Sequence, residues 1–147
     1  MVNHDPADIA RRSAEAMWSA DSASKALGMV VEHVSPGQAR VSMEIRDDMV
    51  NGWGLCHGGL IASVADSAFA LACNSRGTVT VASGFQIEFL EPGRLGETLV
   101  AEAREVTTRG GSGVYDVTVR NATTAIAEFR GRSKSLRRPI LEEEDQT

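Results

Sequence analysis

The sequence contains little of what defines several common classes of protein. Only two of its 147 residues are cysteines, Cys56 and Cys73, which is too few for a disulfide-stapled scaffold. One disulfide is possible, but two free thiols in a reduced cytoplasm are the simpler expectation. The chain has only three histidines beside them, so we expect no metal site.

Two further absences concern membranes and nucleic acids. No apolar run reaches the ~18 uncharged residues of a membrane span, and the start, MVNHDPADIARR, lacks the hydrophobic core of a secretory signal. The chain carries 15 Lys and Arg against 20 Asp and Glu, a net charge of −5 that is poorly suited to general nucleic-acid binding. We therefore expect a cytoplasmic protein with neither membranes nor nucleic acids as partners.

The overall composition is that of a globular protein, with 42% hydrophobic and 24% charged residues. A chain of this length usually forms one domain. We therefore expect a single domain over residues 1–147. Within it, we expect an N-terminal helical extension at 1–24 and an acidic disordered tail at 139–147.

The pattern of residues predicts two helices and six strands. Residues 5–20 mix apolar and charged side chains at helical spacing, and residues 58–75 are rich in Ala, Leu and Ile and contain no proline. Alternating or β-branched runs predict a hairpin at 28–45 and strands at 78–92, 96–106, 112–121 and 124–136. Because helices and strands do not alternate, the fold class is α+β, with the long helix packed on an antiparallel sheet.

The long helix contains a single charged residue. Between His57 and Arg76 the only charge is that of Asp66. One interpretation is a solvated polar stripe that Asp66 shares with Ser63, Ser67 and Asn74. An exposed helical face usually carries several charged side chains, however. We therefore favour a confined polar site, where carboxylates often have catalytic use.

This helix is predicted to begin at His57-Gly58-Gly59. Unpaired N–H groups at a helix start carry partial positive charge, and glycine lets a ligand oxygen come close. The arrangement can stabilise an oxyanion, although Gly-Gly is also a common hinge. Gly58 and Asp66 are eight positions apart, or ~12 Å along one helix. If both act on one carbonyl, two copies of the helix must cross, and the protein must be at least a dimer.

These residues lie within longer segments that resemble a known family. Residues 51–77 (NGWGLCHGGLIASVADSAFALACNSRG), with 85–103, 113–119 and 127–135, are similar to the PaaI subgroup of hotdog-fold acyl-CoA thioesterases. The resemblance implies a long central helix wrapped by an antiparallel sheet, homodimers paired into homotetramers, and active sites at the dimer interface. It also implies hydrolysis of acyl-CoA, with (hydroxy)phenylacetyl-CoA of phenylacetate degradation as the typical substrate. No separate cofactor is implied, because coenzyme A is part of the substrate.

The resemblance assigns catalytic roles to five residues. The Gly58 N–H matches the group that polarises the thioester carbonyl. Asp66 matches the carboxylate, supplied across the dimer interface, that activates water or attacks directly. Asn51 matches an Asn near the carbonyl, although an Asn before glycine also favours a turn. His57 matches the His beside the first glycine, and Ser67 is expected to hydrogen-bond Asp66, the water or a local backbone carbonyl.

Further residues are expected to hold the substrate. Arg130, Arg132 and Lys134 alternate along a predicted strand, so they share a face that could meet either phosphates or solvent only. In relatives, the turn that matches Arg109-Gly110-Gly111-Ser112 contacts the nucleotide end of coenzyme A. The expected substrate-binding set is Gly59, Ser83, Arg109, Gly111, Ser112 and Arg132. Within it, Ser83 matches a position at which related enzymes sometimes supply a hydroxyl to the water.

Other chemistries fit the residues less well. The sequence has no G-x-S-x-G elbow of a serine hydrolase and no Gly-Lys-Ser/Thr of a P-loop. A hotdog hydratase or dehydratase uses a His with an acid, but His57 and Asp66 are nine positions apart and would face opposite sides of one helix. A non-catalytic acyl-CoA-binding hotdog protein is the remaining alternative, and the presence of both Gly58 and Asp66 argues against it.

Overall fold

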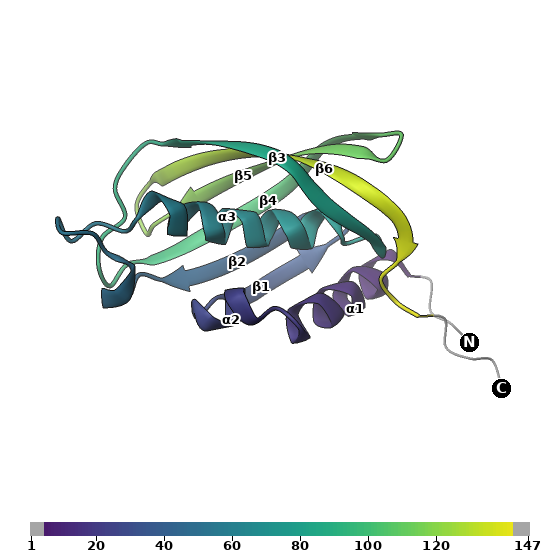
Figure 1. The fold of residues 1–147 in the computed structure, drawn as a ribbon, viewed down its shortest axis with the longest axis horizontal. Coiled ribbons are helices and arrows are strands. Elements are labelled where there is room, and N and C mark those ends of the chain that lie inside the picture. Colours follow the sequence, from purple (N-terminus) through teal and green to yellow (C-terminus); the bar gives the residue numbers. More distant parts are fainter. Residues whose placement is uncertain (1–4, 143–147) are drawn as a thin grey trace.

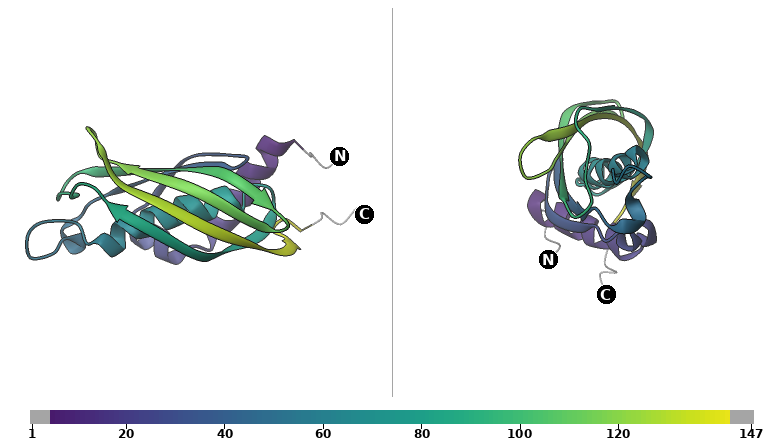
Figure 2. Two further views of the ribbon diagram at one scale, coloured as in Figure 1. Left: turned by 90° about the horizontal axis from the view of Figure 1, so that it is seen from above. Right: turned by 90° about the vertical axis from the view of Figure 1, so that its left-hand side faces the viewer.

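A six-stranded antiparallel sheet curves around one long helix, as Figure 1 and Figure 2 show. The structure is a computed structural model that describes residues 5–142. Its elements are α1 (Pro6–Ser19), α2 (Ser22–Ala26), β1 (Val30–Ser35), β2 (Gln38–Glu44), the short 3-10 helix η1 (Asp47–Met49), α3 (Gly58–Cys73), β3 (Thr78–Phe89), β4 (Thr98–Arg109), β5 (Ser112–Arg120) and β6 (Ala125–Pro139). The strand order is β1-β2-β4-β5-β6-β3, so β1 and β3 form the two edges.

Helix α3 lies inside the curve because most of its surface is small and apolar. Alternate side chains of the strands point toward it, among them Val117 and Val119 of β5, which are fully buried. Gly131 of β6 lets the ring of Phe69 approach the backbone, since a Cβ there would lie 2.8 Å from the ring. The buried residues of α3 are Ile61, Val64, Ala65, Ala68, Phe69, Leu71 and Ala72.

The end of α3 is tied to two other parts of the chain by buried polar side chains. The Asn74 amide donates to the carbonyl oxygens of Ala70 (2.8 Å) and Thr80 (2.9 Å), and its oxygen accepts from the Thr80 N–H (2.8 Å). The Ser75 hydroxyl accepts from the Gly37 N–H at 2.8 Å. These bonds hold β3 and the β1–β2 turn against the helix end.

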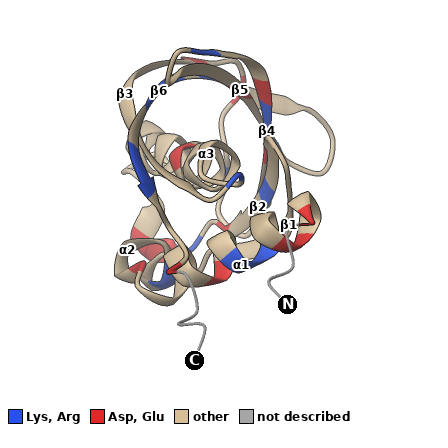
Figure 3. Ribbon diagram, turned by 90° about the vertical axis from the view of Figure 1, so that its right-hand side faces the viewer, with Lys and Arg blue, Asp and Glu red and all other residues tan. Residues whose placement is uncertain are grey.

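Helices α1 and α2 lie on the side of α3 that the sheet leaves open (Figure 3). Ala20 and Asp21 separate the two helices, and Asp21 caps α2, because its carboxylate accepts from the Ser24 N–H at 3.0 Å. Helix α2 was not predicted from the sequence. Its five residues are too short for a periodic pattern, and the helix end at Ala26 lies two positions beyond the expected extension at 1–24.

The hotdog architecture predicted from the sequence is confirmed: α3 packs against a six-stranded antiparallel sheet. Several boundaries differ by one to three residues: β3 ends at Phe89 rather than at residue 92, β4 spans Thr98–Arg109 rather than 96–106, and β5 ends at Arg120 rather than at residue 121. Helix α3 ends at Cys73 rather than at residue 75, and β6 continues to Pro139, three residues past its predicted end and into the expected tail at 139–147. Residues 143–147 of that tail lie outside the described residues. No helix between residues 5 and 142 is long and apolar enough to cross a membrane.

Candidate active site

The start of α3 presents free backbone N–H groups. Among the described residues, none accepts a hydrogen bond from the Gly58 or Gly59 N–H, whereas the Leu60 N–H already bonds to the His57 carbonyl at 3.0 Å. The ring of Phe89 covers Gly58 closely, since a Cβ on Gly58 would lie 2.8 Å from it. An oxygen bound at this helix start would therefore meet two free donors beside an aromatic wall.

Asp66 lies two turns further along α3 and is half-buried. Burial raises the pKa of its carboxyl group, and the nearby charge of Asp21 raises this pKa further. No described residue donates a hydrogen bond to the carboxylate, so it is free to bind a water or a ligand. Asp66 is thus less enclosed than its uncharged helix suggested, but its raised pKa makes the carboxylate a stronger base.

The Ser67 hydroxyl was expected to hydrogen-bond Asp66, the water or a local backbone carbonyl. In the structure it bonds neither Asp66 nor a local carbonyl. Its Oγ lies 2.8 Å from the Oγ of Ser24 in α2, and the Ser24 hydroxyl in turn lies 2.6 Å from the Asp21 carboxylate. The partner of Ser67 comes from 43 positions earlier in the chain. Asp21 and Ser24 are therefore residues near the site that were not predicted from the sequence, although an N-cap Asp before SASKA is a recognisable helix-start signal.

Asn51 and His57 shape the loop that leads into α3. The Asn51 side-chain oxygen accepts from the N–H groups of Trp53 (2.9 Å) and Leu55 (3.1 Å). This is the turn-forming role that the sequence left open for it. His57 is the N-cap of α3 with an exposed side chain that makes no capping bond, while its own N–H donates to the Met49 carbonyl at 2.9 Å.

The predicted coenzyme A residues of β4, β5 and β6 lie together. The β4–β5 turn is tight, with Gly110 and Gly111 both at positive φ, and Ser112 pairs with Lys134 of β6. Arg109 pairs with Ser112 across the turn. The expected alternation of β6 is confirmed, because Arg132 and Lys134 are exposed on the outer face while Ser133 between them is buried.

Arg130, which was weighed as a phosphate ligand, and Ser83, which was expected to offer a hydroxyl to the water, both have partners within the chain. Arg130 forms a two-pronged ion pair with Asp116, with N–O distances of 2.6 and 2.8 Å, so its guanidinium is already occupied. Ser83 lies at an irregularity in the β3–β6 pairing, and its hydroxyl donates to the Arg132 carbonyl at 3.2 Å. These contacts leave the Arg132 side chain as the better phosphate candidate.

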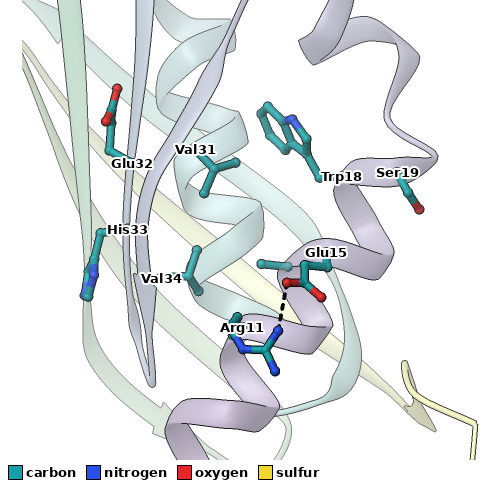
Figure 4. Close-up of a pocket in the computed structure, with 9 residues that line it drawn as sticks. Arg11, Glu15, Trp18, Ser19, Val31, Glu32, His33 and Val34 are labelled. Atoms are coloured by element: carbon teal, nitrogen blue, oxygen red, sulfur yellow. Dashed lines mark hydrogen bonds and ion pairs between the residues drawn. The ribbon is translucent and has the colours of Figure 1, made fainter.

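A separate hollow of about 490 Å³ lies between α1 and β1 (Figure 4). Trp18 and Val31 form apolar walls, and Arg11 is paired with Glu15 at its rim at 2.8 Å. None of the predicted site residues lines this hollow. Residues 5–142 also contain no group of three or more His, Cys, Asp or Glu side chains placed to hold a metal ion.

Comparison with known proteins agrees with this geometry. The model of the thioesterase superfamily matches residues 54–128. The acyl-coenzyme A thioesterase PaaI of Escherichia coli (strain K12) is 43% identical over 123 residues, which are 83% of this chain and 88% of the relative.

Solved structures give the same result. The E. coli PaaI protein from the phenylacetic acid degradation operon has a TM-score of 0.90 at 40% identity, covering 92% of this chain and 99% of that one. A Streptococcus mutans protein bound to acetyl CoA has a TM-score of 0.72 at 28% identity, covering 76% and 90%.

The central helix, the curved sheet and the glycine-rich helix start define a hotdog-fold protein. Within that class, the chain belongs to the thioesterase superfamily and is a PaaI-type hotdog thioesterase. The resemblance inferred from residues 51–77 is thereby confirmed, as is the prediction that the protein is a thioester hydrolase. Its oligomeric state, its location in the cell and the roles of individual residues remain predictions.

Proposed function

We propose that the protein hydrolyses an aryl-acyl-CoA thioester, such as a (hydroxy)phenylacetyl-CoA, to the free acid and coenzyme A. The observation that carries the proposal is the pairing on α3 of two free backbone donors, at Gly58 and Gly59, with one unpartnered carboxylate at Asp66. Thioester hydrolysis needs both functions: donors stabilise the oxyanion that forms on the carbonyl oxygen, and a carboxylate supplies or activates the nucleophile.

Hydrolysis consumes one water molecule, and Gly58 and Asp66 are the groups of the protein that take part. The Gly58 N–H polarises the carbonyl, water attacks the carbonyl carbon, and Asp66 takes up the proton of that water. Collapse of the tetrahedral intermediate breaks the C–S bond, and the proton passes to the departing thiolate of coenzyme A. In the second route, the Asp66 carboxylate attacks the carbonyl carbon, the C–S bond breaks and coenzyme A leaves as the thiolate. Water then hydrolyses the resulting mixed anhydride to the free acid and the Asp66 carboxylate, and the proton released passes to the thiolate.

The site is proposed to form between two copies of the chain. Along one helix Gly58 and Asp66 are ~12 Å apart, too far to contact one carbonyl group. Edge strand β3 leaves Phe85 at 45% and Phe89 at 51% exposed, although their register partners Gly131 and Ala127 are buried on the inner face. Pairing of β3 with β3 of a second copy about a two-fold axis would cover these rings and bring two α3 helices antiparallel. An active monomer in light scattering would contradict this arrangement.

Substrate binding is proposed to use both ends of the thioester. The ring of Phe89 beside Gly58 is an apolar wall suited to an aromatic acyl group. Arg132 and the turn at Arg109, Gly111 and Ser112 are the proposed site for the phosphates of coenzyme A. Support comes from the relative's origin in a phenylacetic acid degradation operon and from the acetyl CoA bound to the S. mutans protein.

The test is release of free thiol from phenylacetyl-CoA, acetyl-CoA and a long-chain acyl-CoA. We expect phenylacetyl-CoA to be the preferred substrate. Asp66→Asn should lower turnover by at least ~10²-fold, because a general base is lost. The variant should still form the dimer. Coenzyme A binding without thiol release would instead indicate a non-catalytic acyl-CoA-binding protein, and hydration of an enoyl-CoA without thiol release would indicate a hydratase. ¹⁸O from water entering Asp66 in a single turnover would select the nucleophilic route.

A further inference from the structure

Hydrogen bonds among three polar side chains connect the start of α2 to α3 at Ser67, the residue that follows Asp66. The Ser67 Oγ lies 2.8 Å from the Ser24 Oγ, which lies 2.6 Å from one oxygen of Asp21. The other oxygen of Asp21 accepts from the Ser24 N–H at 3.0 Å. Ser24 is only 4% exposed, so water does not readily replace these bonds.

The chemistry of the three groups sets the direction of each hydrogen bond. An ionised carboxylate only accepts, so the Ser24 hydroxyl must give its single proton to Asp21. The Ser24 oxygen is then an acceptor toward Ser67, and Ser67 must donate its own proton to Ser24. The Ser67 oxygen is left with lone pairs and no proton to offer to anything else.

We propose that Asp21 and Ser24 are positioning residues that hold the Ser67 hydroxyl as a hydrogen-bond acceptor beside Asp66. This inference rests on the proposed function. A water molecule that attacks a thioester has two protons, and in this arrangement one points to the Asp66 carboxylate and the other to the Ser67 oxygen. The water is thereby oriented with its lone pair toward the carbonyl carbon.

Two titratable groups face Asp66 from the described residues. One is Asp21, at the N-cap of α2, whose negative charge raises the pKa of Asp66 in addition to the effect of burial. The other is Cys73 on α3, whose own burial raises the pKa of its thiol to about 12, so it carries no charge at neutral pH. Because the Cys73 thiol is uncharged, Asp21 is the one of these two groups whose charge opposes ionisation of Asp66, and a neutral residue at position 21 removes that effect.

A double-mutant cycle tests the relay. Ser24→Ala should lower kcat by about 10-fold with little change in KM, because binding is intact and only the orientation of the water is lost. The same change in a Ser67→Ala background should have no further effect, since the relay then has no end group. Ser22→Ala is the matched control, because Ser22 is exposed in the same first turn of α2, and it should retain full activity.

Asp21→Asn provides an independent readout. The Asn oxygen can still cap the Ser24 N–H, but its amide would donate to the Ser24 hydroxyl and reverse the direction of the relay. We expect kcat to fall while the acid limb of the kcat/KM profile moves to lower pH, because Asp66 loses a neighbouring negative charge. Ser24→Ala should lower kcat without moving that limb.

The outcomes separate this inference from the proposed function. If Asp66→Asn abolishes thiol release while both Ser24→Ala and Asp21→Asn match the wild type, the relay is refuted and the proposed function stands. Equal losses from Ser24→Ala in the wild-type and Ser67→Ala backgrounds would also refute it, since they would indicate a structural effect. If Asp66→Asn keeps full turnover, the proposed function itself is wrong.

Discussion

Replacing Asn74 by alanine should destabilise the protein markedly without touching the candidate site. Asn74 is the C-cap of α3, is 4% exposed, and makes three hydrogen bonds of 2.8–2.9 Å through its side-chain amide. Two of them bind both backbone groups of Thr80, so the change removes the link between the helix end and the start of β3.

The size of the effect follows from these contacts. A typical intramolecular hydrogen bond contributes a net ~1 kcal/mol, and a buried polar group left without a partner costs ~1–3 kcal/mol. Three lost bonds therefore predict a decrease of about 3 kcal/mol in the free energy of unfolding. For a chain of this size, each kcal/mol corresponds to a shift in Tm of ~2–4 °C, so we expect Tm to fall by about 6–12 °C.

Thermal and urea unfolding followed by circular dichroism would measure this. Asn121→Ala is the matched control, because the Asn121 side chain also makes several hydrogen bonds, including those to the N–H groups of Thr123 and Thr124, but in an exposed turn. Water can replace those bonds, so its effect should be below ~1 kcal/mol. If both variants lost the same small amount of unfolding free energy, the buried hydrogen bonds of Asn74 would not be what stabilises the end of α3.

Two other variants test the packing of α3 and the environment of its carboxylate. Gly131→Ala should lower the free energy of unfolding by ~1–3 kcal/mol through overpacking, because the added Cβ would lie 2.8 Å from the ring of Phe69, which is 1% exposed. Asp66→Asn should raise stability at pH 7. Since burial raises the pKa of Asp66 above its unfolded value, the ionised carboxylate costs stability at neutral pH, and wild-type stability recovers as the pH falls through the raised pKa toward the unfolded one.

Each of these predictions has a direct check. Gly52→Ala is the control for Gly131→Ala, because a Cβ at Gly52 has no atom within 4 Å, and unfolding in urea should distinguish the two variants clearly. For Asp66→Asn, unfolding free energies across pH 4–8 should show an advantage over the wild type at pH 7 that disappears near pH 4. An advantage that grew as the pH fell would show that the carboxylate is not disfavoured by burial.

Much of the fold was predictable because its signals are local. The alternation of β5 and β6 and the small apolar surface of α3 are properties of consecutive residues, and both appear in the structure where the sequence placed them. The short helix α2 was not predictable by periodicity, because five residues do not complete two turns. Its position depends on contacts with α3 rather than on its own propensity.

The sequence by itself determined which groups are chemically available, namely one carboxylate at Asp66 within an otherwise uncharged helix and a Gly58-Gly59 start that leaves amides free. Only the tertiary structure decided their neighbours. It brought the Phe89 ring over Gly58 and joined Ser67 to Ser24, 43 positions away. The reason is physical: helix propensity and patterning act between residues a few positions apart, whereas a hydrogen bond between distant segments depends on how whole elements pack.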